Sequence, residues 1–305
     1  MPVTFEHEPI YSTARTSLYT QEELRRDAFD DRVYARFVEE GALRPHPDEA
    51  LSRRLHDYTI DMALDVYLKA QVDAGRKLVG IMGGSSTRRD DPAYRRTAET
   101  AMLLAQSNFL VISGGGTGMM EAANLGAYLV PHGPEALDAA IGELARCPTY
   151  GSADYRARAL DVLERYPAGG ESLGVPTWFY GHEPTNYFAA AVAKYFSNSL
   201  REDGLLGMAV DGVVYTPGSA GTTQEIFQDA AQNHYGTYEF RSPMVFLGVH
   251  RFAAETHIYP TLYGLATAEY RPLLAITDDP DEVVRFLLRA GKVPVRKPAA
   301  RPVTL

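Results

Sequence analysis

The 305-residue chain contains a single cysteine, Cys147, and therefore cannot form an internal disulfide bond. No nucleophile signature surrounds Cys147, so we interpret it as a structural thiol. The first 19 residues are polar and lack the apolar core of a signal peptide. No apolar run approaches the roughly 18 residues of a membrane span. These absences predict a cytoplasmic protein with no membrane segment.

Basic residues are outnumbered, since 30 Lys and Arg stand against 39 Asp and Glu and give a net charge of −9. A nucleic-acid-binding protein normally presents a basic face, so we expect no nucleic-acid partner. The eight histidines include no pair with metal-ligand spacing, and we expect no catalytic metal. The Gly-Lys-Ser/Thr of a Walker loop is also absent, which argues against a P-loop enzyme.

Short apolar segments alternate along the chain with segments of helical periodicity. The first of these units reads strand, loop, helix, strand, glycine loop, helix, which is typical of βαβ units on a parallel sheet. We therefore predict an α/β fold with a Rossmann-like, doubly wound parallel sheet. Strands are expected at 77–82, 109–112, 172–175, 213–215, 243–249 and 273–276, and helices at 22–40, 48–68, 92–107, 119–128, 184–199, 222–235, 259–268 and 278–288.

The pattern also predicts how the chain is divided. Residues 1–75 form an N-terminal helical extension, of which residues 1–19 are expected to be poorly ordered or draped over the surface. Residues 76–290 form a nucleotide-binding domain. Proline and glycine interrupt its rhythm at about 129–171, which we interpret as a helical insertion serving as a lid, an oligomer contact or a solvated surface arm. Residues 291–305 form a loose, proline-rich tail.

Three glycine-containing loops follow core strands, at 83–86, 114–118 and 217–222. Glycine leaves room for a ligand to approach the backbone, and the helix N-terminus after such a loop favours an anion such as phosphate. The dinucleotide fingerprint lacks its third glycine, because Met119 occupies that position. We therefore expect a mononucleotide or a sugar phosphate as the ligand, and not NAD.

The third loop allows two interpretations. Gly218 and Gly221 are expected to adopt backbone angles closed to other residues, and Glu225 then lies near whatever the loop holds. Alternatively, Thr222 is the N-cap of a plain helix start and Glu225 closes a capping box. The residues alone leave both open.

Residues 114–120 and 217–225 resemble the two hallmark motifs of the LOG family, the lysine-decarboxylase-like Rossmann proteins, which are Gly-Gly-Gly-x-x-Gly-x-Met and Pro-Gly-Gly-x-Gly-Thr-x-x-Glu. The resemblance covers about residues 77–290 without the insertion. It implies a nucleoside 5′-monophosphate phosphoribohydrolase, or nucleotide nucleosidase, that forms a homodimer or a larger homo-oligomer. Lysine decarboxylation is rejected because it needs pyridoxal phosphate on a lysine, and no lysine lies at a glycine loop. We expect no cofactor.

By this resemblance the catalytic residues are Glu225 and Arg201. A buried carboxylate suits cleavage of an N-glycosidic bond because it stabilises an oxocarbenium-like sugar and orients water. We expect the substrate phosphate to be bound by Gly115, Gly116, Thr117, Gly218, Ser219, Gly221 and Thr222. We expect Gly84, Ser85, Met119 and Asn186 to lie near the base or ribose.

Two departures from the family motifs keep other functions open. Ser219 replaces a glycine, and Arg201 is followed by Glu202 in place of lysine. Arg201 can instead form a surface salt bridge with Glu202 or Asp203. Other polar residues, Asn186 and Lys194, can then serve the site. Met119 and Met120 can simply pack their helix onto the sheet. The alternatives to an enzyme are a non-catalytic carrier of a nucleotide or phosphorylated cofactor, and a structural oligomer whose inserted helices recruit a partner.

Overall fold

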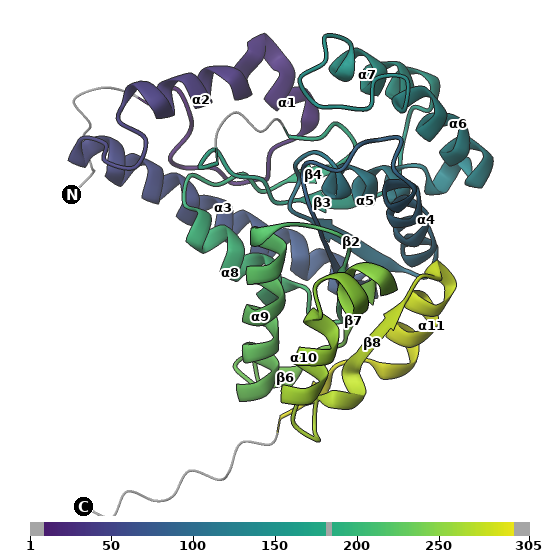
Figure 1. The fold of residues 1–305 in the computed structure, drawn as a ribbon. Helices are drawn as coiled ribbons and strands as arrows, with labels where there is room; N and C mark the ends of the chain where they lie inside the picture. The colour runs from purple at the N-terminus through teal and green to yellow at the C-terminus, as the bar shows by residue number, and fades with distance from the viewer. Residues whose placement is uncertain (1–8, 181–184, 296–305) are drawn as a thin grey trace, which may run out of the picture.

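The computed structural model describes residues 9–180 and 185–295. Its centre is a seven-stranded sheet with the order β4-β3-β2-β1-β5-β7-β8, in which every pair is parallel (Figure 1). The strands are β1 (Lys77–Met82), β2 (Phe109–Ser113), β3 (Ser172–Gly174), β4 (Ala191–Val192), β5 (Val213–Tyr215), β7 (Met244–Leu247) and β8 (Leu274–Thr277). This sheet confirms the predicted α/β, Rossmann-like fold.

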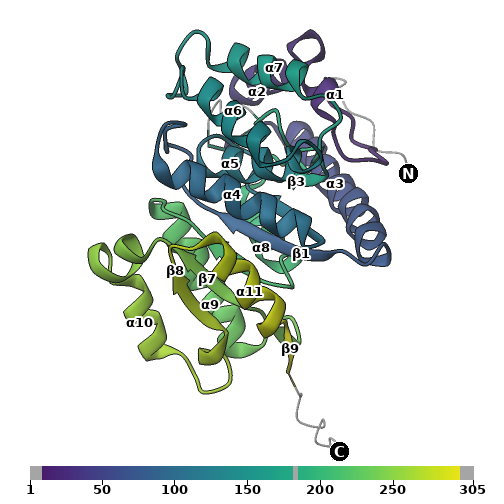
Figure 2. The same cartoon turned by 90° about the vertical axis from the view of Figure 1, so that its right-hand side faces the viewer.

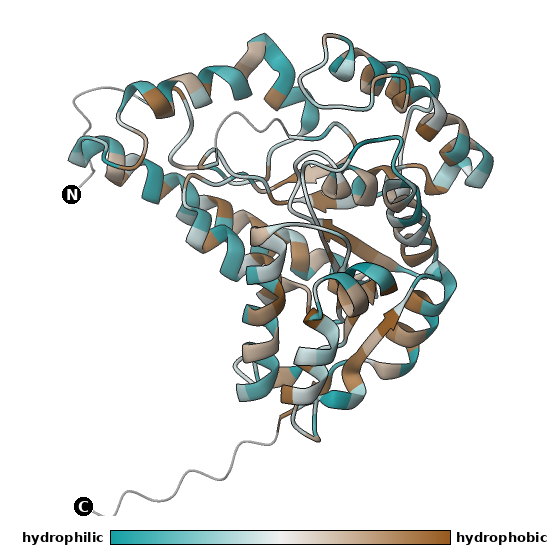
Figure 3. Cartoon of the chain, viewed as in Figure 1, coloured by the Kyte–Doolittle hydropathy of each residue, from teal (hydrophilic) through white to brown (hydrophobic). Residues whose placement is uncertain are grey.

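Alternation along the strands builds a core on each face of the sheet. In β1, Val79 and Ile81 pack on one face, whereas Leu78 and Met82 pack on the other. Helices therefore cover both faces (Figure 2), and apolar residues concentrate on the strands between them (Figure 3). The first face carries α4 (Pro92–Gln106), α5 (Met119–Tyr128) and α11 (Pro280–Ala290), and the second carries α3 (Pro47–Asp73), α8 (Asn198–Met208), α9 (Ala220–Tyr235) and α10 (Ile258–Leu265).

The N-terminal part of the chain packs tightly on this core. Helix α1 (Gln21–Arg25) and helix α2 (Phe29–Glu39) precede the long α3. Tyr19 is fully buried, and its backbone exchanges two hydrogen bonds with Val192, at 2.9 and 3.0 Å. The expectation that residues 1–19 are poorly ordered or draped over the surface is wrong for Tyr11, Leu18 and Tyr19, whose buried side chains complete the core. The residues between Tyr11 and Leu18 are mostly exposed, and residues 1–8 lie outside the described part.

The helix predicted at 184–199 is also wrong. Residue 184 lies outside the described chain, and the residues from 185 to 197 run without a helix and include the edge strand β4. The aromatic and β-branched side chains in this segment match a helical spacing. Phe188, Val192 and Tyr195 are indeed buried, but on an extended segment and not on a helix. The segment is extended because it pairs with β3 on one side and with Tyr19 on the other.

The start of α8 is held by the N-terminal helices. The carboxylate of Asp57 on α3 accepts hydrogen bonds from the backbone N–H groups of Phe196 and Ser197, at 2.9 and 2.8 Å. Ser197 is the N-cap of α8 but makes no side-chain capping bond of its own. Asp57 thus satisfies amides at this helix start, and it is itself held by the ring of His56 at 2.9 Å. Arg201 lies in α8, so the N-terminal helices help to fix its position.

Residues 129–171 form two further helices, α6 (Pro134–Leu144) and α7 (Tyr155–Arg165). Leu137 and Val162 are buried in a third apolar cluster together with side chains of α4 and α5. The alternative of a solvated surface arm is therefore wrong for this segment, because it shares an apolar core with the sheet domain.

The remaining elements are short. Strand β6 (Phe240–Arg241) pairs antiparallel with β9 (Val293–Pro294). The other turns of helix are η1 (Arg26–Ala28), η2 (Val130–His132), η3 (His250–Glu255) and η4 (Arg271–Leu273). Within residues 9–180 and 185–295, no helix combines the length and the apolar character needed to cross a bilayer.

Candidate functional site

The candidate site lies where the direction of strand addition reverses. The chain builds β1, β2, β3 and β4 in one direction and then returns to the opposite side of β1 with β5. In open parallel sheets, ligands bind beyond the carboxyl ends of the strands at such a reversal. A cavity of about 760 Å³ opens there, and all three glycine loops contribute to its wall.

The loop after β1 holds the other two loops in place. The backbone N–H of Gly84 donates to the carbonyl of Pro217 at 3.0 Å, which joins the first loop to the third. The carbonyl of Gly84 accepts from the N–H of Met119 at 3.0 Å, which joins it to the second loop. The Thr117 hydroxyl also donates to the carbonyl of Ser85 at 2.9 Å. The three turns therefore form one rigid backbone assembly.

Glycine is needed at two contacts of this assembly. Gly118 has a left-handed φ of 63°, and a Cβ there would lie 2.4 Å from the carbonyl oxygen of Gly84. A Cβ on Gly218 would lie 2.1 Å from the Thr222 hydroxyl oxygen. Neither Gly218 nor Gly221 has the left-handed backbone that we expected. Gly218 is required by close approach instead, and Gly221 faces open space.

Helix α9 begins on the cavity wall. Its first residue is Ala220 and its N-cap is Ser219, which makes no side-chain capping hydrogen bond. Thr222 is thus inside the helix, and the capping-box interpretation with Glu225 is wrong. The first amides of an α-helix have no partner within the helix. Since residues 219–222 line the cavity, these amides and the positive end of the helix dipole are available to a ligand there.

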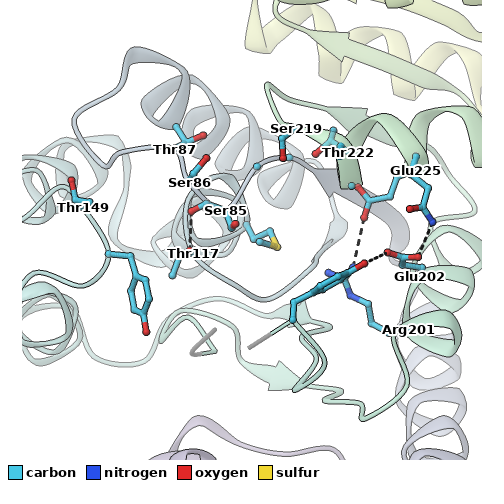
Figure 4. A pocket seen from close by; sticks show the side chains of 18 of the residues that line it. Ser85, Ser86, Thr87, Thr117, Thr149, Arg201, Glu202, Ser219, Thr222 and Glu225 are labelled. Carbon is cyan, nitrogen blue, oxygen red and sulfur yellow. Dashed lines mark hydrogen bonds and ion pairs between the residues drawn. The ribbon is translucent and has the colours of Figure 1, made fainter. Parts of the chain in front are cut away.

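The guanidinium of Arg201 is buried and anchored from two sides. Its Nε donates to the carbonyl of Val175 at 2.8 Å, and its Nη2 to the carbonyl of Gly114 at 3.4 Å. Its Nη1 lies 3.8 Å from Oε1 of Glu225 (Figure 4). The alternative of a surface salt bridge with the adjacent acids is therefore wrong. The anchoring carbonyls orient the cation toward the cavity carboxylate.

Glu225 lies on α9 and is only 9% exposed. Burial raises the pKa of its carboxyl to about 7, with Arg201 acting to lower the pKa and the charge of Glu202 acting to raise it. One turn further along α9, burial also raises the pKa of Asp229 to about 7, although a hydrogen bond from the Tyr215 hydroxyl at 2.8 Å opposes this shift. Of these two groups, Glu225 lines the cavity, so the cavity wall includes a carboxyl group whose pKa burial raises to about 7.

The structure brings most of the predicted site residues to this one cavity. Those that line it are Gly84, Ser85, Thr117, Arg201, Ser219, Gly221, Thr222 and Glu225. They come from the three loops and from α8 and α9, and the whole set is spread over more than a hundred positions of the sequence.

The other predicted residues lie behind the cavity wall, among them Gly218, whose backbone packs on Gly84. The N–H of Gly115 already donates to the Ser113 hydroxyl at 3.0 Å, so it is not free for a phosphate.

The Asn186 amide donates to the carbonyl of Gly116 at 3.1 Å and so supports the second loop from behind. Met119 is 1% exposed and packs beside Gly83. The glycine-rich second loop is therefore mainly a packing element, with Thr117 as its cavity residue.

Sequence reasoning missed part of the wall. The additional lining residues include Thr87, Pro148, Thr149, Tyr150, Tyr155, Tyr180, Glu202 and Gln224. Pro148 to Tyr155 belong to the segment interpreted as an insertion, for which a lid was one interpretation, but no local pattern indicates which of its residues reach the cavity. Glu202 had a signal, since it follows Arg201 directly. Among the described residues, no three His, Cys, Asp or Glu side chains are grouped to hold a metal ion.

A buried ion pair fastens this segment to the cavity. The Arg89 guanidinium binds the Glu121 carboxylate through two hydrogen bonds of 2.7 Å, with both side chains almost fully buried. The hydroxyls of Tyr94 and Tyr155 donate to the same carboxylate, at 2.8 and 3.3 Å. Arg89 also donates to the carbonyl of Tyr155 at 2.9 Å. The start of α7 is thereby fixed as one side of the cavity.

A known family model matches the part of the chain that carries the first two glycine loops. Residues 76–130 match the model of the SLOG cluster4 family. The SLOG cluster4 match therefore covers β1, α4, β2 and α5, with the first two glycine loops, and it ends before the third loop and α9. A comparison with curated proteins found no match.

Several solved structures are similar to this chain at low sequence identity. The molybdenum cofactor binding protein from the phototrophic bacterium Rippkaea orientalis is 12% identical, with a TM-score of 0.46, over 70% of this chain and 96% of that one. The Moco carrier protein from Chlamydomonas reinhardtii is 16% identical, with a TM-score of 0.43, over 70% and 98%. The structural-genomics target TM1055 is 19% identical, with a TM-score of 0.44, over 70% and 99%. At these values, none of the three bears on which ligand the cavity binds.

The contact at Gly218 yields a stability prediction with a matched control. Gly218→Ala should lower the free energy of unfolding by about 1–3 kcal/mol, because the new methyl group overlaps Thr222. Gly221→Ala should leave the stability unchanged or raise it by up to about 1 kcal/mol, since alanine favours a helix and the site is open. Urea unfolding of both variants measures the difference. Equal stabilities would contradict the packing described here.

Proposed function

We propose that the protein hydrolyses the N-glycosidic bond of a nucleoside 5′-monophosphate and releases free base and ribose 5-phosphate. The observation that carries this proposal is the buried Arg201–Glu225 pair, at 3.8 Å, in a cavity onto which the N-terminus of α9 opens. A helix start suited to an anion and a carboxyl group with a pKa raised to about 7 are thus on the wall of one cavity, which supports the proposal.

The phosphate is assigned to the start of α9. Backbone N–H groups of residues 220–222 and the hydroxyls of Ser219 and Thr222 supply donors at one place. The helix dipole adds a favourable potential for the phosphate charge. Further hydroxyls lie across the cavity on Ser85, Ser86 and Thr87 (Figure 4). No metal ion is needed to account for anion binding at such a terminus.

The sugar is assigned to the space between the helix start and Glu225. At about 1.5 Å of rise per residue, residues 221 and 225 are separated by roughly 6 Å along the axis of α9. A ribose that projects from a phosphate at the helix start therefore extends along the helix toward the Glu225 carboxylate. Its anomeric carbon, C1′, is then the sugar atom placed beside that carboxylate.

This arrangement suits glycosidic hydrolysis. The oxygen of water forms a bond to C1′ while the bond from C1′ to the base nitrogen breaks, and the base departs with the electron pair. The sugar carries positive charge in the transition state, which an ionised Glu225 stabilises. The same carboxylate accepts a proton from the attacking water, and the departing base nitrogen takes up a proton from solvent to give the free base. Arg201 holds the carboxylate in place and, through its charge, favours the ionised form.

The first test is a direct assay of base release. AMP, GMP, CMP, UMP and IMP are incubated with the protein and the products are separated by chromatography. Wild type should release base from at least one of them, and Glu225→Gln should lower kcat by roughly 10²- to 10⁴-fold because it removes the ionisable group. The matched control is Glu135→Gln, the same change at an exposed position on α6.

Two results of this assay would oppose the proposal. Full activity of Glu225→Gln would remove Glu225 from the mechanism. Nucleotide binding by folded wild type without release of any base would instead favour the carrier of a nucleotide or phosphorylated cofactor.

The pH dependence gives an independent prediction. Because the active form of Glu225 is ionised and its pKa is raised to about 7 in the ligand-free protein, kcat/KM should be low at pH 5–6, rise through pH 7 and level off above it. A rate profile of base release between pH 5 and pH 9 measures this. A profile that falls as the pH rises through 7 would show that the protonated carboxyl is the active form, and would contradict the role given to Glu225.

A further inference from the structure

A second carboxylate, that of Glu202, lies on the cavity wall next to Arg201. It is 8% exposed, and each of its oxygens accepts one hydrogen bond from the wall. Oε2 accepts from the Gln224 amide at 2.9 Å, and Oε1 accepts from the Tyr180 hydroxyl at 3.4 Å (Figure 4). Both partners also line the cavity. The carboxylate thus accepts from two neutral donors, of which the Gln224 amide is the shorter contact.

The Glu202 carboxylate retains capacity to bind a ligand. An ionised carboxylate offers about four lone-pair sites, and the two wall contacts occupy only half of them. None of the ion pairs formed within residues 9–180 and 185–295 involves Glu202. A carboxylate in this position accepts hydrogen bonds and donates none, so its complement is a ligand group with hydroxyl or amino hydrogens.

The position of Glu202 relative to Glu225 indicates which part of the ligand lies against Glu202. Gln224, which holds Glu202, precedes Glu225 on α9, and the charge of Glu202 acts on the Glu225 carboxyl. Both acids therefore face the same end of the cavity. Two carboxylates stand against the single guanidinium of Arg201 at that end, so a phosphate is favoured at the start of α9 instead, which fixes the direction of the ligand. The sugar hydroxyls next to C1′ then lie toward Glu202.

We propose that the Glu202 carboxylate accepts hydrogen bonds from the 2′- and 3′-hydroxyls of the ribose, and so selects ribonucleotides over 2′-deoxyribonucleotides. This inference rests on the function proposed above. The two hydroxyls are adjacent donors that one carboxylate can accept together, a pairing known from carboxylates that bind the ribose of dinucleotides. Loss of the 2′-hydroxyl leaves a buried charged acceptor with one partner fewer.

The test compares kcat/KM for AMP and 2′-dAMP, or for the nucleotide that proves to be cleaved and its 2′-deoxy form. Wild type should prefer the ribonucleotide by roughly 10- to 100-fold, the range for a hydrogen bond to a charged group. Glu202→Gln should bring the two values close together, mainly through a loss with the ribonucleotide. Any effect of Glu202 on the ionisation of Glu225 acts on both substrates and cancels in the ratio.

The matched control is Asp203→Asn, which removes the same charge from the next residue of α8. Asp203 is exposed, accepts from the Gln228 amide and does not line the cavity. This variant should keep the wild-type preference. A preference that Asp203→Asn abolishes as fully as Glu202→Gln would overturn the proposal, because it would assign the effect to overall charge.

The wild-type ratio needs no variant and already tests the inference. Equal kcat/KM for the two sugars would overturn the role of Glu202 while leaving the glycosidase intact. If no nucleotide loses its base, titration of the protein with ribose 5-phosphate and with 2-deoxyribose 5-phosphate still tests whether Glu202 binds the ribose hydroxyls. Tighter binding of ribose 5-phosphate by wild type, lost in Glu202→Gln, supports the proposal, and equal binding of the two sugars overturns it.

Discussion

The site depends on the backbone contact between the loops after β1 and β5. These strands are neighbours in the sheet although more than a hundred residues separate them, because the chain first builds β2, β3 and β4 on one side. The hydrogen bond from Gly84 to Pro217 joins their loops, and the lack of a side chain on Gly218 lets the loops touch. That contact sets the place where α9 begins, and hence where both its free amides and Glu225 lie.

The pKa of Glu225 depends on the same geometry. A carboxyl group buried on α9 resists ionisation, as the raised pKa of Glu225 indicates, and only a cation fixed nearby opposes this. Arg201 is such a cation because two backbone carbonyls hold it, and α8 is itself held at its start by Asp57. The N-terminal helices thus contribute to the site without lining it. A merely surface-exposed arginine would be screened by solvent and would influence the carboxyl less.

The sequence predicted the local units of this fold better than their assembly. The strand, glycine loop and helix around residues 213–235 have strong local signals. Hydrophobic patterning was therefore enough to predict where along the chain each of them lies. Patterning predicted a helix at 184–199 because the aromatic spacing suits one. The segment is extended instead, because it pairs with β3 and with the segment around Tyr19. Patterning also could not show that residues of the 148–155 segment reach the cavity, because this depends on contacts distant in sequence. The hydrogen bond from the Gly115 amide to Ser113 is local, but it depends on the conformation of the loop, which patterning does not predict.

The central claim is that the start of α9 and the Glu225 carboxyl act on two ends of one nucleotide. A crystal structure of Glu225→Gln with AMP tests this most directly, because the variant is expected to bind substrate without cleaving it. The account predicts phosphate density against the amides of residues 220–222 and the anomeric carbon beside residue 225. A nucleotide bound in the reverse direction, or in another part of the molecule, would contradict it.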